Sequence, residues 1–383
     1  MPTAQSGMGC MPSAPSKPES ALPKRIALIN PTKFLGNLLL AGGLMQALCQ
    51  ACQQQGVALL VVLDASFKEL LADALPGAQI VYYPRRELSR GVTFNSARLW
   101  LDCVRQIRAF APELAFTIEE DSVCHRLTHF SGAKHKVSST VHRYQWGFDQ
   151  VLDIPRSGRQ MGEEGIWYSF RDVFSALDLP VAPSLKPDGH VVPAYVRLTP
   201  PPPGPVLTER LTAAGVELNA PIAVLHAGAS KHYKQWPVNL FAELATQLVG
   251  QGYQLLLIGA GKRDAAVNEA ITQALSAVAV SGINLCNELS LAELASLLTC
   301  VDVMVGNDSG PSHLASALGV RGVVIFGPTD LAIWRPLGGQ TTALQEKQVC
   351  AHNCTRHRCD QQYACLQAIT PDQVMTVLTT NSL

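Results

Sequence analysis

The residues with the clearest chemistry follow an apolar run at 301–305, which predicts a buried strand. They are Asp308-Ser309-Gly310 and His313, and the run at 314–318 predicts the first turns of a helix. A loop between a strand and a helix exposes backbone N–H groups at the positive helix end, where phosphate binds. Because Asp308, Ser309 and His313 can also hold a ribose, a diphosphate or a sugar, the segment predicts a nucleotide or nucleotide-sugar ligand.

Three other strands in the second half also end in glycine-rich or charged residues. Strands are predicted at 222–226, 254–258 and 322–326, and the segments 226–231, 259–264 and 327–330 follow them. The carboxyl ends of parallel strands meet at one edge of a sheet. We therefore expect a shared site, with Lys234 as a cation and with Asp264 and Asp308 as acceptors for ribose or sugar hydroxyls.

The elements that position these residues alternate between strand and helix along the whole chain. In the first half, strands are predicted at 24–29, 57–63, 79–83 and 113–118. Helices are predicted at 38–52, 67–75, 97–110 and 123–130, then at 238–251, 264–275 and 291–298. This alternation is typical of parallel α/β sheets.

The proline-rich run at 200–205 is the best domain boundary, because it is expected to form neither a helix nor a central strand. We predict a disordered leader (1–23), an N-terminal domain (24–198), a linker (199–218), a C-terminal domain (219–345) and a Cys-rich segment with a C-terminal helix (346–383). Two α/β domains joined in this way place a ligand cleft between them.

The composition narrows the class of protein. The 383 residues are 47% hydrophobic, and 30 Lys and Arg balance 30 Asp and Glu, for a formal net charge of zero. The balance argues against a general nucleic-acid binder. No apolar run reaches the length that spans a bilayer, and the leader lacks the apolar core of a signal peptide. We therefore expect a cytosolic protein.

Taken together, the motifs resemble glycosyltransferase family 9, the ADP-heptose:lipopolysaccharide heptosyltransferases. The resemblance covers about residues 24 to 380. It implies a GT-B fold, in which two Rossmann-like domains face each other across a cleft, with the acceptor mainly on the first and the nucleotide sugar on the second. The matching segments are 35–40, 131–134, 225–230, 234–237, 306–314, 326–330 and 368–371.

The resemblance also implies roles for single residues. Lys234 would contact the donor diphosphate and offset charge on departing ADP, Asp264 would bind the ribose, and Leu289 in the segment 288–291 would lie against adenine. The alternative for Asp308 is a cap of the following helix. The remaining residues implied to line the donor are His226, Ala229, Ser230, Asp308, Ser309, Gly310 and His313.

The catalytic base is the point where this chain departs from the family. Inverting transfer needs a group that accepts the proton of the acceptor hydroxyl, and the family usually has an Asp directly after the Gly of its N-terminal loop. Here that residue is Asn37, which is no base at neutral pH. Either Asn37 only orients the acceptor, or activity has been lost, or another carboxylate serves. The acids Glu119, Glu120 and Asp121 follow the strand at 113–118, and we hypothesise that Glu120 or Asp121 is the base.

Two basic groups are candidates for an acidic or phosphorylated acceptor. Arg85, Arg86 and Arg90 follow the third strand, and 134–136 forms a second group. Each is equally well explained as a solvated cluster. The polar segment at 143–164 suits either an acceptor loop or a passive connection.

Four thiols cluster near the C-terminus, at Cys350, Cys354, Cys359 and Cys365. Four thiolates can close a tetrahedral zinc or iron site. Free thiols and local disulfides are the alternatives. Any metal there would be structural, and we expect no cofactor to be required for catalysis.

These observations predict an inverting, metal-independent transferase. Its donor would be ADP-heptose, and its acceptor a lipopolysaccharide core intermediate or related glycan, with peripheral contact at the inner face of the inner membrane. Two alternatives stay open. One is a transferase for another nucleotide sugar or a protein acceptor, and the other is a nucleotide-sugar-binding homologue without activity.

Overall fold

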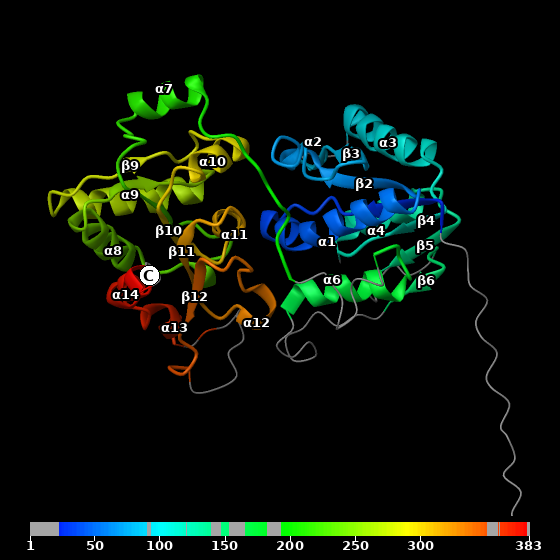
Figure 1. Ribbon diagram of the computed structural model, residues 1–383. Coiled ribbons are helices and arrows are strands. Elements are labelled where there is room, and N and C mark those ends of the chain that lie inside the picture. The colour runs from blue at the N-terminus through cyan, green and yellow to red at the C-terminus, as the bar shows by residue number, and fades with distance from the viewer. Residues whose placement is uncertain are drawn as a thin grey trace, which may run out of the picture.

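The computed structural model describes residues 23–89, 93–119, 121–138, 147–152, 165–181, 193–350, 359 and 361–380. These residues form two α/β domains that lie side by side (Figure 1). The expected leader, apart from its last residue, and most of the segment 143–164 lie outside the described residues.

The N-terminal domain is built on a six-stranded parallel sheet in the order β3-β2-β1-β4-β5-β6. Helices α1 and α6 cover one face, and α3 and α4 cover the other. Its strands are β1 (Arg25–Ile29), β2 (Ala58–Asp64), β3 (Gln79–Tyr83), β4 (Leu114–Phe116), β5 (His135–Ser138) and β6 (Gln150–Val151). Its helices are α1 (Leu35–Gln54), α2 (Arg85–Leu88), α3 (Phe94–Ala109), α4 (Ser122–Phe130) and α6 (Gly165–Ala176).

The C-terminal domain repeats this topology in the order β12-β11-β10-β7-β8-β9. Its sheet lies between α10 and α11 on one face and α8, α9 and α14 on the other. The strands are β7 (Ile222–His226), β8 (Gln254–Leu257), β9 (Ile283–Asn284), β10 (Val303–Asn307), β11 (Arg321–Phe326) and β12 (Thr341–Gln345). The helices are α7 (Pro205–Ala213), α8 (Val238–Gly250), α9 (Lys262–Ser276), α10 (Leu291–Leu298), α11 (Gly310–Ala317), α12 (Leu331–Trp334), α13 (Ala364–Gln367) and α14 (Pro371–Thr380).

The strand order reverses once in each sheet, between β1 and β4 and again between β7 and β10. Ligands of doubly wound sheets bind at such switch points, beyond the carboxyl ends of the strands. The strands lie in the protein interior because their residues are mostly apolar. Six of the seven residues of β2 and all five of β7 are buried. The expected α/β class with two Rossmann-like domains is confirmed.

Two local expectations differ from the structure. The helix expected at 67–75 is wrong, because this segment holds a short 3-10 helix (Ala65–Phe67) followed by turns. Asp64 accepts from the Ser66 N–H and fixes the 3-10 turn. The segment 199–218 contains α7, which begins with Pro205 at its first position. Proline fits there because the first N–H of a helix needs no partner.

Helix α1 contacts both α11 of the C-terminal domain and the connection between the domains. Of the described helices, it alone is long and apolar enough to cross a membrane, and ten of its twenty residues are buried in the protein core. The connection to α7 crosses it (Figure 1). The Val196 N–H donates to Leu39 O at 3.2 Å, and the Gln46 side chain accepts from the Arg197 N–H at 2.7 Å. A Cβ on Gly42 or Gly43 would overlap this connection, so the glycines allow its close approach.

Candidate active site

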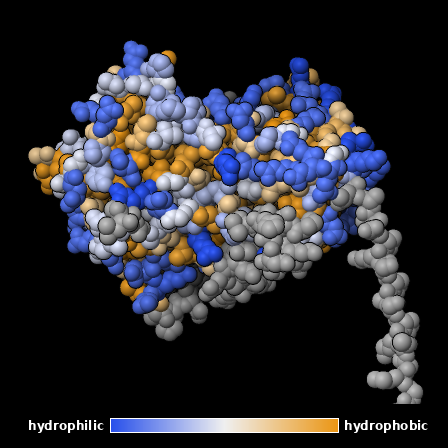
Figure 2. All heavy atoms as spheres, in the orientation of Figure 1, coloured by the Kyte–Doolittle hydropathy of each residue, from blue (hydrophilic) through white to orange (hydrophobic). Residues whose placement is uncertain are grey.

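A cavity of about 780 Å³ lies between the two domains. The space-filling view shows the surface hollowed there (Figure 2). One wall is the turn that opens α1, including Asn37, and the other is formed by the loops after β7, β8 and β10 together with α10. All ten residues predicted on the donor side line it: His226, Ala229, Ser230, Lys234, Asp264, Leu289, Asp308, Ser309, Gly310 and His313. The structure thus brings the predicted set together.

Lys234 and Asp308 form an ion pair at the cavity wall, with Nζ and Oδ2 2.7 Å apart. The Asp308 side chain is 5% exposed and that of Lys234 is 20% exposed. Asp308 does not cap α11, whose N-cap residue is Ser309 and which has no side-chain cap among the described residues. The first-turn N–H groups of α11 therefore remain available at the cavity, the arrangement that binds an anion.

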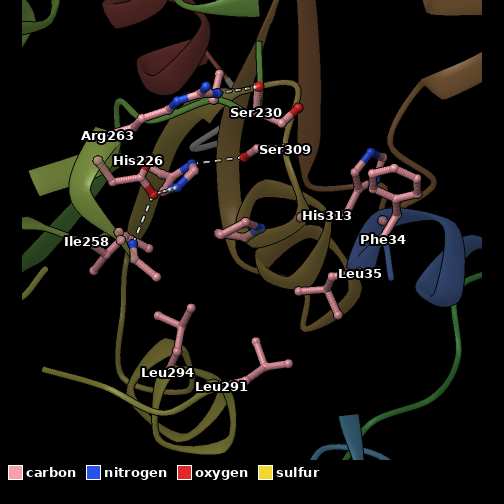
Figure 3. Close-up of a pocket in the computed structure, with 18 of the residues that line it drawn as sticks. Phe34, Leu35, His226, Ser230, Ile258, Arg263, Leu291, Leu294, Ser309 and His313 are labelled. Carbon is pink, nitrogen blue, oxygen red and sulfur yellow. Dashed lines mark hydrogen bonds and ion pairs between the residues drawn. The ribbon is translucent and has the colours of Figure 1, made fainter. Parts of the chain in front are cut away.

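A chain of hydrogen bonds joins the two loops at the switch point of this sheet (Figure 3). The Ser309 hydroxyl lies 2.9 Å from His226 Nδ1, and His226 Nε2 lies 3.5 Å from Asp264 Oδ2. Burial opposes the charge on Asp264, but hydrogen bonds from the His226 side chain and the Ala260 N–H lower its pKa below the ordinary value. Asp264 thus stays an anionic acceptor. A Cβ on Gly228 would overlap its carboxylate, so this approach requires glycine.

His313 occupies the point where the domains touch. Burial lowers its pKa from 6.5 to about 4, so the ring is neutral at physiological pH. The Tyr195 hydroxyl of the interdomain connection lies 2.7 Å from its Nδ1. A Cβ on Gly36 would lie 3.0 Å from His313 Cδ2, and one on Gly310 would lie 2.9 Å from Leu35 Cβ. Two glycines therefore let α1 and α11 approach closely.

One side of the cavity is apolar. Leu291 and Leu294 point into it from α10, across from His226 and Ser309 (Figure 3). The predicted adenine segment 288–291 includes Leu291 but not Leu294, although the three-residue spacing on α10 places both leucines on a shared face. No motif in the sequence predicted that Lys33 and Phe34 line the cavity. The cavity-lining residues that were not predicted are Lys33, Phe34, Ile258, Leu285, Leu294 and Trp334.

The Asn37 side chain contacts a carboxylate, that of Glu119, which is not itself among the residues that line the cavity. The Asn37 Nδ2 donates to Glu119 Oε1 at 3.2 Å and to Oε2 at 3.4 Å. Glu119 is 7% exposed and follows β4, the neighbour of the strand that precedes Asn37. Asp121 lies farther along this loop, where Oδ1 caps α4 through the Val123 N–H at 2.7 Å. Glu120 lies outside the described residues.

The arginines proposed for the acceptor do not line the cavity in the described structure. Arg85 forms ion pairs of 3.2 Å with both Asp64 and Asp121, and it donates to Pro31 O. It therefore ties the loops after β1, β2 and β4 together. Arg86 is exposed on α2, and Arg90 lies outside the described residues.

The cysteines do not come together within the described residues, where no three His, Cys, Asp or Glu side chains form a metal-binding group. Cys365 is buried against α14 and the C-terminal sheet, and Cys359 Sγ accepts from the Tyr363 N–H at 3.2 Å. Cys354 lies outside the described residues.

Comparison with known proteins identifies the second half of the chain. Residues 206–364 match the model of glycosyltransferase family 9 (heptosyltransferase). These residues form a glycosyltransferase family 9 domain. The family 9 domain holds all ten donor-side residues, whereas Asn37 and Glu119 lie before it.

Curated relatives of the chain agree with this assignment. Lipooligosaccharide heptosyltransferase 2 of Campylobacter jejuni serotype O:6 (strain 81116) is 29% identical over 153 residues, which cover 39% of this chain and 48% of the relative. Lipopolysaccharide heptosyltransferase 2 of Salmonella typhimurium is 34% identical over 112 residues, or 29% and 32% of the two chains. The chain thus spans about half or less of the curated relatives that it matches.

Solved structures match over nearly the whole chain and share the fold. The glycosyl transferase family 9 protein from Veillonella parvula has a TM-score of 0.74 and 16% identity, covering 94% of this chain and 97% of the other. Escherichia coli heptosyltransferase WaaC with ADP-2-deoxy-2-fluoro heptose has a TM-score of 0.62 and 17% identity, covering 94% and 100%. The GT-B architecture is thereby confirmed.

Proposed function

We propose that the protein is an inverting heptosyltransferase that moves heptose from ADP-heptose to a lipopolysaccharide core acceptor. One observation carries the proposal: ten residues from the segments that follow β7, β8, β9 and β10 line one cavity, against the α1 turn of the other domain. The family 9 domain and a solved relative that holds an ADP-heptose analogue support the choice of donor.

The walls of the cavity match the parts of such a donor. Adenine fits the apolar side, between Leu289 and the α10 leucines, and the ribose hydroxyls suit the anionic Asp264. The diphosphate would lie at the start of α11 within reach of Lys234. The heptose would then face the α1 turn, where the acceptor enters.

The reaction follows from this placement. The acceptor hydroxyl attacks the anomeric carbon, its proton passes to a carboxylate, and the bond to the diphosphate breaks with the electron pair leaving on ADP. Lys234 and the N–H groups of α11 offset the charge that develops on the leaving group. Because the protein supplies these groups itself, we propose that transfer persists in EDTA.

A transfer assay tests the function. Purified protein is incubated with ADP-heptose and a truncated lipopolysaccharide core, and ADP release and the product mass are measured. Donor binding by calorimetry without transfer would favour the non-catalytic homologue. Transfer from another nucleotide sugar, or to a protein acceptor, would favour the other alternative. No binding of ADP or ADP-heptose would overturn the proposal.

Two further parts of the proposal need separate measurements. Elemental analysis of protein purified without a histidine tag tests for structural zinc or iron at the thiols of Cys350, Cys354, Cys359 and Cys365. Co-sedimentation with vesicles of anionic phospholipid tests the proposed location at the inner face of the inner membrane, where the lipid-linked acceptor would be met.

A further inference from the structure

The residue after Gly36 lines the cavity but cannot accept a proton, since it is Asn37. An amide has no basic site at neutral pH, and general base catalysis by a positioned side chain contributes about 10²–10⁴-fold to a rate. The proposed transfer therefore needs another carboxylate close to Asn37 that can reach the acceptor hydroxyl in the cavity.

Glu119 is the described carboxylate that contacts Asn37. Strands β1 and β4 are paired neighbours at the switch point, so the turn after β1 and the loop after β4 open at the same edge of the sheet. The Asn37 amide spans the two loops and donates to both carboxylate oxygens, at 3.2 and 3.4 Å. The Glu119 backbone is also fixed, because its N–H donates to Thr117 Oγ1 at 3.2 Å.

We propose that Glu119 is the catalytic base and that Asn37, which lines the cavity, is a positioning residue that holds the Glu119 carboxylate beside the cavity wall. The inference rests on the proposed transferase function. In the step, the acceptor O–H proton moves to a Glu119 oxygen while the acceptor oxygen bonds to the anomeric carbon. The bond from that carbon to the diphosphate breaks, and ADP leaves with its electron pair.

Asp121 is engaged elsewhere in the same loop. Its Oδ1 accepts from the Val123 N–H at the start of α4, and its Oδ2 lies 3.2 Å from the Arg85 guanidinium. Both contacts draw this carboxylate toward α4 and α2 rather than toward Asn37. Asp121 thus holds the loop that presents Glu119.

Relocating the carboxylate tests the proposal. Glu119→Gln keeps an acceptor for the Asn37 amide but removes the base, so kcat for ADP-heptose should fall at least about 100-fold. The dissociation constant of ADP should stay within about twofold. Glu119→Gln/Asn37→Asp places a carboxylate on the cavity wall and should recover at least about tenfold of the lost kcat. The control Glu243→Gln makes the same change at an exposed carboxylate on α8 that does not line the cavity, and it should keep kcat within about threefold of wild type.

The outcomes separate the two proposals. Glu119→Gln turnover within about threefold of wild type contradicts the inference, whereas the heptosyl transfer itself then stands. A loss in Glu119→Gln that Glu119→Gln/Asn37→Asp does not recover assigns Glu119 a structural role and also overturns the inference. If the wild-type protein binds ADP-heptose but does not transfer heptose, the proposed function is wrong, and the assignment of Glu119 as a base is wrong with it.

Discussion

Lys234 and Asp308 are paired before any donor is present, at 2.7 Å and with the carboxylate almost completely buried. The partner fixes the ammonium group at the cavity wall and limits the reorganisation needed when a diphosphate arrives. Lys234 therefore combines two roles, as a counter-ion of Asp308 and as a charge that the leaving group would meet.

Replacing Lys234 should mainly slow the chemical step. Lys234→Met keeps the length of the side chain and removes its charge, so we expect kcat to fall about 100-fold, in the range seen when one charge-stabilising donor is lost. Steady-state kinetics with ADP-heptose measure this. Lys262→Met, at another lysine that lines the cavity, is the control and should change kcat less than about threefold. Equal losses in both variants would contradict the assignment.

The neutral His313 makes stability depend on pH. Its folded pKa is about 4, below the ordinary 6.5, so the unfolded chain binds a proton that the folded chain rejects between these values. Stability should therefore fall as the pH drops from about 6.5 toward 4, by up to about 1.4 kcal/mol per pH unit from this group. Urea unfolding of wild type and His313→Gln at pH 7, 6 and 5 measures the difference. Parallel pH dependence in the two proteins would contradict it.

At the scale of elements, helix α1 depends on glycine for its contact with the interdomain connection. Alanine normally stabilises a helix relative to glycine by about 1 kcal/mol. At Gly43 the sign should reverse, because the added Cβ would overlap the backbone carbonyl of Ala194. We expect Gly43→Ala to lower the melting temperature by several degrees.

Gly250, the last residue of α8, provides the matched control. No heavy atom of the described chain, its own helix aside, lies within 4 Å of the Cβ that alanine would add there. Gly250→Ala should therefore keep or slightly raise the melting temperature. Thermal denaturation of both variants, followed by circular dichroism, compares them. If the Gly43→Ala protein is as stable as Gly250→Ala, the interdomain connection shifts to accommodate the added Cβ without loss of stability, which contradicts the prediction.

The elements that sequence predicts well are those whose own residues determine them. The apolar runs at 222–226 and 291–298 appear as β7 and α10 with the predicted bounds, because burial on the sheet requires that pattern. The two-residue strands β6 and β9 carry too few residues for a pattern. The segment 67–75 shows apolar spacing that turns also accommodate, so periodicity alone failed there.

The candidate site divides in the same way. The loops after β7, β8 and β10 were predictable, because each motif contains the glycines and polar groups that it uses. The partners of Arg85 were not, since Asp64 and Asp121 are distant in sequence and meet it only in the folded sheet. For the same reason Glu119, 82 residues from Asn37, was recognised only as one of three adjacent acids.

At the scale of the whole molecule, a donor should stabilise the fold. A ligand that binds only the native state adds about 2.7 kcal/mol at 100 times its dissociation constant. ADP and ADP-heptose should therefore raise the melting temperature by several degrees. UDP and UDP-glucose serve as controls and should raise it less, because the apolar wall of the cavity suits a purine. Differential scanning fluorimetry compares the four compounds, and equal shifts would contradict an adenine-selective cavity.

The pairing of β1 with β4 also bears on how such enzymes diverge. Loops that leave neighbouring strands reach one point of the cleft from two remote places in the gene. A reactive group can therefore move to a different position in the sequence and still occupy the same position in the folded site. A homologue that lacks the usual Asp after this glycine can therefore still be active. In a divergent relative, the candidate base is the acidic residue, from the loop after either β1 or β4, that lies beside the glycine equivalent to Gly36.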